Sequence, residues 1–338
     1  MRNIRVPRRA AAAIVLAAVW GVAPRIAIGR QAANDLDPAA KQELKAGQDA
    51  LEAGRLANAE KSFRQAIKLS HENCSLCYDG LARTLGAQGD TRGGLKAADK
   101  VMALAQTDAQ RAAAHGLRGF VLSGENGKKK ETEAEYRQAV ALDGKTAEYH
   151  LSLGLTLMRE SQDEEGKAEV AEYLSLEPTG RFAADARKLE ANPKRAREEM
   201  APEFSMTTLR GETVSLDQFA GRFVVLDFWA TWCPACRESL GDLKELTKKY
   251  PPERVVLISV SADANEGAWK EFVAKKNMDW YQYRDAKGAI QHTFGIRVLP
   301  TYVVIDPQGA ICQKIQGEDP QKSVVGELKT TLAKMTAE

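Results

Sequence analysis

Apolar residues in the first half of the chain recur with the spacing of amphipathic helices, and this pattern repeats along the chain. Each copy has two helical segments separated by small residues, such as Gly54 and the stretch LGAQGD at 85–90. An apolar position every three or four residues indicates a helix that buries one face. The second segments of the four copies are AEKSFRQAIKL (59–69), GLKAADKVMAL (94–104), TEAEYRQAVAL (132–142) and GKAEVAEYLSL (166–176).

These copies start 35, 38 and 34 residues apart, and one equivalent position in them is taken by Phe63, Ala98, Tyr136 and Val170. A period near 34 residues with two helices per unit resembles the tetratricopeptide (TPR) repeat. The resemblance implies an all-α TPR solenoid over residues 36–186, whose concave face binds a peptide or a protein partner. A helical domain with a purely architectural role is the alternative.

After residue 200 the pattern changes from helical spacing to short apolar runs. A charged helical stretch at 187–200 is expected to link the two parts. Residues 223–229, FVVLDFW, are almost wholly apolar, as in a buried strand. The segment PACRESLGDLKELTKKY that follows the next turn has helical spacing, with Pro234 suited to a first helical position. The sequence therefore predicts a second, α/β domain over residues 201–338.

Two of the five cysteines lie at this predicted turn. The strand–turn–helix pattern places Cys233 at the N-terminus of the helix and Cys236 one turn further along the same face. Unpaired backbone N–H groups and the helix dipole stabilise an anion there, so the pKa of the Cys233 thiol should fall below about 8.5. We expect Cys233 to attack a disulfide and Cys236 to resolve the mixed disulfide. A structural disulfide or two zinc ligands are the alternatives, although no second cysteine pair nearby completes a zinc site.

Longer stretches around this turn resemble a known family. VVLDFWATWCPACRESL is similar to the active-site segment of the thioredoxin superfamily, and APEFSMTTLRGETVSLDQFAGRF before it is similar to the lead-in of the exported TlpA/ResA-type branch. GIRVLPTYVVIDPQGAI (295–311) resembles the later segment that carries the superfamily's cis-proline. The resemblance covers residues 201–338. It implies a thioredoxin-like fold and thiol–disulfide oxidoreductase activity that needs neither a cofactor nor a metal.

The same resemblance implies roles for particular residues. Asp227 matches the buried carboxylate that moves a proton to and from the resolving cysteine, and burial should raise its pKa. Pro300 matches the cis-proline, and Leu299 would offer backbone hydrogen bonds to a bound substrate segment. Trp232 would form an apolar wall of the site. The sequence departs from thioredoxin because no lysine lies within 255–261 to pair with the carboxylate. An aspartate facing water and a trans turn proline are the alternatives.

The other three cysteines lie outside this motif. Cys74 and Cys77 form a second C-x-x-C in the helical half, without the tryptophans and the preceding strand. In an oxidising compartment we expect a structural disulfide between them. A reduced pair, a metal site that includes His71 and a redox role are the alternatives. Cys312 is expected to be a buried, inert thiol in a strand, with an intermolecular disulfide or a second resolving role as alternatives.

The first 29 residues have the composition of a targeting segment. Arginines precede an apolar run at residues 10–23, and the small residues Ala27 and Gly29 offer a cleavage site. The run is shorter than the roughly 20 apolar residues of a membrane span, which favours a secretory signal peptide. An uncleaved N-terminal membrane anchor is the alternative. Both place the rest of the chain on the periplasmic, extracytoplasmic side.

Length and charge narrow the function further. A chain of 338 residues is long enough for two domains, and a net charge of +2 gives no bulk affinity for nucleic acid or anionic membranes. We predict an exported thiol–disulfide oxidoreductase that acts on protein disulfides or dithiols, is served by a redox partner protein and recruits a partner through its repeats. The TlpA/ResA resemblance favours a reductant.

Two other functions are the alternatives to this prediction. One is a thiol peroxidase of the peroxiredoxin type, whose pattern is P-x-x-x-T-x-x-C. Leu226 and Ala230 stand at its Pro and Thr positions, which argues against it. The other is a non-enzymatic TPR scaffold with an idle thioredoxin-like domain, which the intact Cys233, Cys236 and Pro300 argue against.

Overall fold

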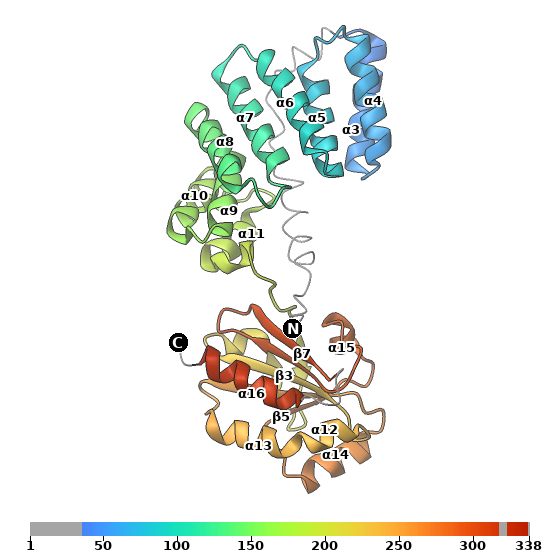
Figure 1. Cartoon of the computed structure of the whole chain (residues 1–338), viewed down its shortest axis with the longest axis vertical. Helices are drawn as coiled ribbons and strands as arrows, with labels where there is room; N and C mark the ends of the chain where they lie inside the picture. Colours follow the sequence, from blue (N-terminus) through green and yellow to red (C-terminus); the bar gives the residue numbers. More distant parts are fainter. Residues whose placement is uncertain (1–35, 318–322, 337–338) are drawn as a thin grey trace. The chain divides into compact units, whose positions relative to one another are not determined.

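The computed structural model describes residues 36–317 and 323–336, and the chain divides into two compact units, Met1–Arg197 and Glu198–Glu338. Figure 1 shows that the first is helical and that the second is a sheet with helices. The predicted fold class, an all-helical part followed by an α/β thioredoxin-like part, is confirmed by these elements. The expected signal peptide or anchor lies outside the described residues. Within the described ranges, no helix is both long and apolar enough to cross a membrane.

Each helix of the first unit packs against its neighbour in the chain (Figure 1). Local sequence signals start several of these helices. The Asp90 carboxylate accepts a hydrogen bond of 2.9 Å from the Gly93 N–H at the start of α6. Thr107 and Gln110 form a capping box at the start of α7. Such caps provide hydrogen-bond acceptors for N–H groups that have no partner within the helix. The elements are α3 (Pro38–Glu52), α4 (Leu56–Leu69), α5 (Ser75–Gln88), α6 (Thr91–Ala103), α7 (Asp108–Leu122), α8 (Lys129–Leu142), α9 (Ala147–Arg159), α10 (Asp163–Leu176), α11 (Ala183–Ala191) and the 3-10 helix η1 (Pro193–Ala196).

The repeated position of the sequence marks a close contact between the two helices of a pair. Phe63 of α4 is fully buried and lies against Gly47 of α3, where an added Cβ would be 2.7 Å from the ring. The glycine is needed because any side chain there would overlap the phenylalanine. The same arrangement recurs in later pairs, between Tyr136 and Gly119 and between Val170 and Gly154. Three of the four repeated positions thus share one packing arrangement, and the fourth, Ala98, is fully buried as well.

Residues 187–196, which we expected to form part of a linker, belong to the helical unit instead. Leu189 of α11 and Ala196 of η1 are buried in a core shared with α9 and α10. The Arg197 guanidinium closes this end of the unit through an ion pair of 2.6 Å with the Asp163 carboxylate. The division between the two units therefore falls after Arg197, because the charged stretch still contributes apolar side chains to the core.

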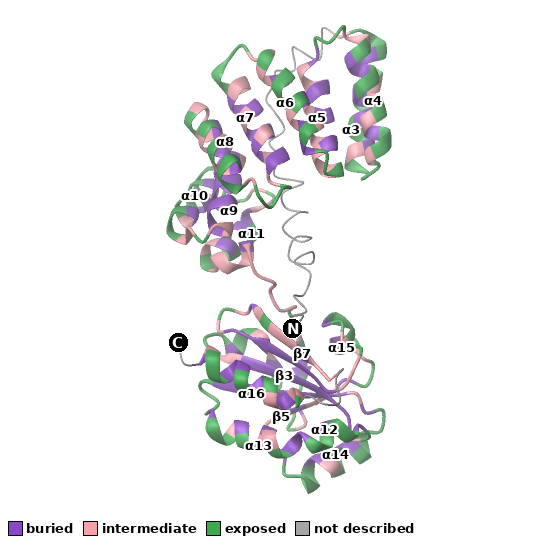
Figure 2. Cartoon of the chain, in the orientation of Figure 1, coloured by how far each residue is buried: buried purple, intermediate pink, exposed green. Residues whose placement is uncertain are grey.

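The second unit has a five-stranded sheet in the order β5-β4-β3-β6-β7, and a separate hairpin of β1 and β2. The central strand β3 runs parallel to β4 and antiparallel to β6. Successive side chains of β3 point to opposite faces, so Val225 packs with α13 and α16 while Leu226 and Phe228 pack with α15 and the hairpin. Figure 2 shows that the central strands β3, β4 and β6 are buried and that the outer helix faces are exposed. The elements are β1 (Ser205–Thr207), β2 (Thr213–Ser215), η2 (Leu216–Phe219), β3 (Phe223–Trp229), α12 (Pro234–Glu238), α13 (Leu240–Lys249), β4 (Val255–Ser261), α14 (Glu266–Lys275), β5 (Tyr281–Arg284), α15 (Ala289–Thr293), β6 (Thr301–Ile305), β7 (Ile311–Gln316) and α16 (Val324–Met335).

Cys312 is exposed, so the expectation of a buried thiol is wrong. Its side chain belongs to β7, which is an edge strand of the sheet. The register shifts at this point, because Val304 pairs with Gln313 and Ile305 pairs with Ile311, which leaves Cys312 as the extra residue of a β-bulge. A bulge re-aims a side chain from its regular direction, and the apolar alternation of the sequence does not reveal it.

Candidate active site

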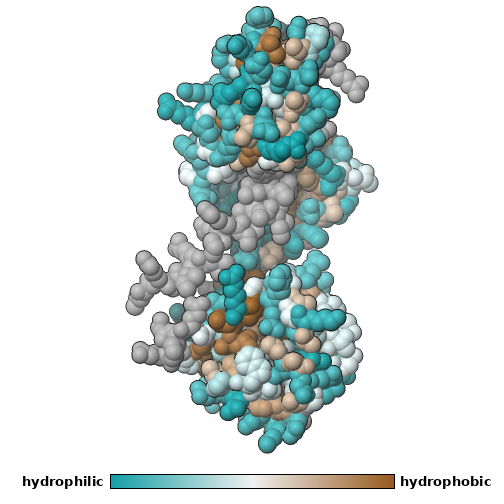
Figure 3. Space-filling model, turned by 90° about the vertical axis from the view of Figure 1, so that its right-hand side faces the viewer, coloured by the Kyte–Doolittle hydropathy of each residue, from teal (hydrophilic) through white to brown (hydrophobic). Residues whose placement is uncertain are grey.

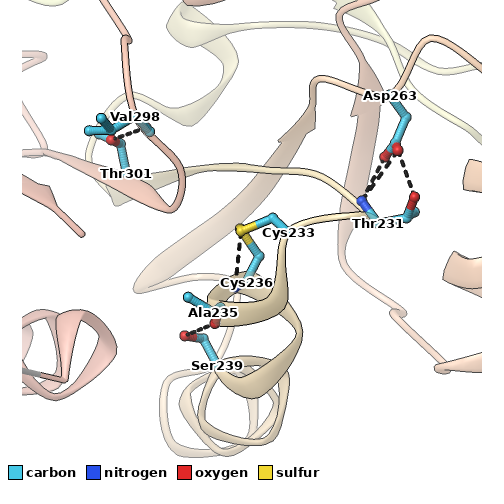
Figure 4. The surroundings of a disulfide bond; sticks show 8 residues. All are labelled: Thr231, Cys233, Ala235, Cys236, Ser239, Asp263, Val298 and Thr301. Atoms are coloured by element: carbon cyan, nitrogen blue, oxygen red, sulfur yellow. Dashed lines mark hydrogen bonds between the residues drawn. A yellow bond between two sulfur atoms is a disulfide. The ribbon is translucent and has the colours of Figure 1, made fainter. Parts of the chain in front are cut away.

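The cysteine pair lies at the junction of β3 and α12. Cys233 is the N-cap residue of α12, with Pro234 at the first helical position. The Cys233 Sγ accepts a hydrogen bond of 3.2 Å from the Cys236 N–H (Figure 4), and the two sulfurs are joined in a disulfide. The same N–H, together with the positive end of the helix, would stabilise a Cys233 thiolate once the disulfide is reduced.

Asp263 holds the loop that leads into the pair. Its carboxylate is buried and accepts hydrogen bonds from the Thr231 N–H at 3.0 Å and the Thr231 hydroxyl at 2.6 Å (Figure 4). It also accepts one of 2.7 Å from the hydroxyl of Ser261, the last residue of β4. The carboxylate thus ties the end of β4 to the loop after β3. Asp263 is therefore a positioning residue for the loop, and sequence reasoning did not single it out.

Asp263→Ala should lower the free energy of unfolding by about 2–3 kcal/mol, because the donors on Thr231 and Ser261 lose their acceptor in a largely buried place. Denaturation of the full chain in urea would measure the change. Asp279→Ala, at an exposed aspartate of the same unit, is the matched control and should leave stability almost unchanged. Equal unfolding midpoints for the two variants would refute the positioning role.

Leu299 and Pro300 lie beside the cysteine pair. The peptide bond between them is cis, as the resemblance implies, and the Leu299 side chain packs on the cluster that contains both cysteines. The Thr301 hydroxyl donates a hydrogen bond of 2.7 Å to the Val298 carbonyl (Figure 4) and so fixes the turn before β6. Among the described residues, the backbone N–H and carbonyl of Leu299 make no hydrogen bond.

The tryptophans beside the pair have different environments. Trp229 is buried and packs with the two cysteines, whereas Trp232 is 65% exposed. Hydrophilic residues cover most of the surface seen in Figure 3. Within the described part of the chain, Trp232 and Leu176 are the large hydrophobic side chains that are classed as exposed. Trp232 therefore presents its indole to solvent next to Cys233, whereas Trp229 packs inside the core.

Asp227 lies in β3 and is buried on all sides, so the alternative in which it faces water does not apply. Its Oδ2 accepts a hydrogen bond of 2.6 Å from the Ser259 hydroxyl of β4, and this hydroxyl accepts one of 2.8 Å from Trp280 Nε1. Burial raises the pKa of Asp227 from 3.8 to about 7, and the bond from Ser259 opposes part of the rise. A carboxyl group that titrates near neutral pH is suited to proton transfer.

Ser259 and Trp280 are site residues that sequence reasoning did not find. The sequence shows that no lysine lies in β4, but it does not show which group faces Asp227 instead. The available signal is the spacing of Ser259 and Ser261 in an otherwise apolar strand, because residues two apart share one face. The register confirms that Ser259 lies opposite Asp227.

The second C-x-x-C lies in the helical unit. Cys74 and Cys77 are buried and form a disulfide. Cys74 is the N-cap residue of α5, and its Sγ accepts a hydrogen bond of 3.1 Å from the Cys77 N–H. No group of three or more His, Cys, Asp or Glu side chains in the described residues could hold a metal ion. The local geometry resembles that of the first pair, and all four cysteines are buried to a similar degree. The first pair differs in its surroundings, because the cis Leu299–Pro300 turn and the exposed Trp232 lie beside it.

Comparisons with known proteins relate the second unit to thiol-disulfide oxidoreductases. The Redoxin family model matches residues 196–332. The chain is 36% identical over 129 residues to the thiol-disulfide oxidoreductase ResA of Bacillus thuringiensis subsp. konkukian, which covers 38% of this chain and 75% of the relative. It is 33% identical to the thioredoxin-like protein YneN of Bacillus subtilis, with 33% and 67% covered. A solved structure described as a thiol:disulfide interchange protein DsbE from Chlorobium tepidum is 29% identical, with 40% of this chain and 96% of that chain covered and a TM-score of 0.37.

Proposed function

The chain belongs to the thiol–disulfide oxidoreductases of the Redoxin family, and from this premise we propose that Cys233 and Cys236 are its redox pair and that it reduces disulfides in proteins outside the cytosol. The observation that carries the proposal is the position of Cys233 at the N-cap of α12, where its sulfur accepts a hydrogen bond from the Cys236 N–H, beside the cis Leu299–Pro300 turn and the exposed Trp232. Such a bond lowers the pKa of the thiol and favours the nucleophilic thiolate. Cys236 lies one turn inside the helix, within reach of the same sulfur.

The reaction has two displacement steps. The Cys233 thiolate attacks one sulfur of the substrate disulfide, and the other substrate sulfur leaves as a thiolate that takes up a proton. The Cys236 thiol then gives its proton to the Asp227 carboxylate, and its sulfur attacks Cys233. The second substrate sulfur is released, and the enzyme disulfide forms. Two electrons pass from the enzyme to the substrate, and a partner dithiol must return them in each cycle.

The substrate would bind as an extended segment beside Leu299. The hydrogen-bonding capacity of the Leu299 backbone, together with the contact of its side chain with the cysteine cluster, supports strand-like pairing at this position. The exposed Trp232 would cover an apolar side chain of that segment. Backbone pairing is independent of sequence, so this arrangement suits an enzyme that accepts several protein disulfides.

The helical unit would recruit the partner, and the N-terminal segment would direct export. The repeated packing of Phe63, Tyr136 and Val170 on glycines supports repeats of the TPR type, and stacked helix pairs of this kind form a curved docking surface for peptides. The arginines and the apolar run of the first 29 residues support export or a membrane anchor on the extracytoplasmic side. In an oxidising compartment the Cys74–Cys77 disulfide would be structural.

A fragment of residues 198–338 should fold alone and reduce a small disulfide at nearly the rate of the full chain, because the redox pair, Asp227 and the Leu299–Pro300 turn all lie in the second unit. The fragment should reduce the natural protein substrate more slowly, since it lacks the docking surface that raises effective concentration. Steady-state rates on both substrate types, with circular dichroism to establish folding, would measure this. A folded but inactive fragment would show that the first unit supplies catalytic groups, and equal rates on the protein substrate would remove the recruiting role.

A further inference from the structure

Four polar side chains cross the sheet in one row, on the face that α13 covers. Asp227 pairs in register with Tyr302 of β6 on one side and with Ser259 of β4 on the other, and Ser259 pairs with Gln282 of β5. Side chains of directly paired residues point to the same face of a sheet. All four residues are buried. Because an unsatisfied buried polar group costs about 1–3 kcal/mol, a polar row through an apolar core needs an explanation.

Gln282 ends this row at a cavity. Its Nε2 and Oε1 are both buried and have no hydrogen-bond partner among the described residues. Gln282 and Trp280 line a cavity of about 360 Å³ near the starts of β4 and β5. A water molecule occupies about 30 Å³ of liquid volume and needs polar partners, so the cavity has room for several waters and Gln282 can anchor one. The remaining walls include Thr208, Arg210, Tyr250 and Leu257.

The cavity and the disulfide lie at opposite ends of the sheet. Cys233 follows the C-terminal end of β3, and β3, β4 and β5 are parallel neighbours, whereas the cavity touches the N-terminal ends of β4 and β5. Asp227 and Ser259 lie between these two ends. The Ser259 hydroxyl donates to the Asp227 carboxylate and accepts from Trp280. When Asp227 is protonated, its carboxyl can donate to the remaining acceptor position of the Ser259 oxygen, and the hydroxyl proton of Ser259 can then turn to a water.

We propose that Ser259 and a water held by Gln282 carry protons between Asp227 and this cavity, so that the proton taken from Cys236 leaves the protein at the end of the sheet away from the substrate. The proposal rests on the proposed function, in which Asp227 accepts that proton. The protonated carboxyl passes its proton to the Ser259 oxygen while the Ser259 proton passes to the water, and buffer in the cavity takes it up. No electrons move in this step. The path would allow Asp227 to be deprotonated while a substrate covers Trp232 and Leu299.

Few ionisable groups act on Asp227 from the surrounding elements. Tyr302 faces it from β6, and burial followed by the charge of Asp227 raises the pKa of this phenol. Asp242 of α13 acts on Tyr302 in the same direction. In this row β4 and β5 present only the neutral side chains of Ser259 and Gln282. Tyr302 therefore stays neutral when Asp227 titrates, and a pH dependence near neutrality can be assigned to the carboxyl.

The test measures how fast Asp227 gains or loses its proton in the full-length protein. Infrared spectroscopy after a pH jump follows the carboxyl band, which is assigned by its loss in Asp227→Asn. In Ser259→Ala the rate of proton exchange at Asp227 should fall about tenfold. This effect is smaller than the full contribution of a positioned acid or base in catalysis. The titration midpoint should rise by about one pH unit, because a bond to the charged form is lost. Gln282→Leu should slow the exchange with little change in the midpoint, and Ser259→Thr should behave as the wild type because it keeps the hydroxyl.

Tyr283→Phe is the matched control, since it removes one hydroxyl from the neighbouring position of β5 on the opposite face. Wild-type exchange rates in Ser259→Ala or in Gln282→Leu would overturn the proposal, because the path needs both residues. A Tyr283→Phe variant as slow as Gln282→Leu would also overturn it, since general loosening of β5 would then explain the effect. The infrared rates test the proton path directly, because they are measured without any disulfide substrate. A wild-type protein that exchanges protons through this path yet reduces no disulfide would disprove only the proposed function.

Discussion

Replacing Cys233 by serine is expected to reduce disulfide reduction to the uncatalysed background. A serine hydroxyl is not ionised near neutral pH and cannot replace the attacking thiolate, so the first displacement cannot begin. Replacing Cys236 instead should leave the first displacement intact but prevent the second, so that the enzyme accumulates as a mixed disulfide with its substrate. Turnover of a protein disulfide and non-reducing electrophoresis of the reaction mixture measure the two effects.

Cys312→Ser is the matched control for these variants, because Cys312 is exposed and lies in β7 outside both disulfides. It should have the turnover of the wild type and should form no additional adduct. None of the three substitutions touches the Cys74–Cys77 disulfide, and circular dichroism of each variant shows whether its helices are folded. Full turnover in both the Cys233→Ser and the Cys236→Ser variants would contradict the assigned chemistry.

Asp227→Asn is expected to slow the resolving step about 100-fold at pH 8, which is the lower end of what general acid–base catalysis contributes. The wild-type rate should rise with pH through about 7, where Asp227 becomes a carboxylate that can accept the Cys236 proton. This inflection should be absent from the variant, because an amide does not titrate. Rapid mixing of the mixed disulfide at a series of pH values measures both features.

The same variant should be more stable than the wild type at neutral pH. The pKa of Asp227 is about 7 in the folded protein and close to 3.8 when unfolded, so the folded state binds more protons and wild-type stability falls as pH rises from about 4 to about 7. Asp227→Asn removes this loss, which is at most about 4 kcal/mol for a shift of this size. A variant that is slow and also less stable at pH 8 would mean that the substitution damages the fold and that the proton-transfer role is unsupported.

The sequence predicts most of the second unit because its local signals agree with the fold. A continuous apolar strand, a turn and a proline at the first helical position define the place of Cys233 without further information. The burial of Asp227 also follows from the run FVVLDFW, since its neighbours on both sides are core residues. The helix pairs of the first unit follow from the repeat, in which Phe63, Tyr136 and Val170 each meet a glycine of the preceding helix.

The features that the sequence does not predict depend on contacts between segments far apart in the chain. Ser259 faces Asp227 only because of the register between β3 and β4, and Asp263 meets Thr231 only after both loops are in place. The bulge at Cys312 depends on the pairing with β6. The residues near 190 have the charge of a linker, but a few apolar positions among them suffice to dock α11.

The central claim is that Cys233 is the attacking sulfur and Cys236 the resolving one, and peptide mapping of the trapped complex tests it most directly. The full-length Cys236→Ser variant, reduced and then mixed with a disulfide-bonded protein substrate, is digested without reducing agent and analysed by mass spectrometry. We expect the substrate cysteine to be linked to the peptide that contains Cys233, and no adduct in the Cys233→Ser variant treated in the same way. A substrate linked to Cys312, or an adduct of equal yield through Cys236 in the Cys233→Ser variant, would contradict the account.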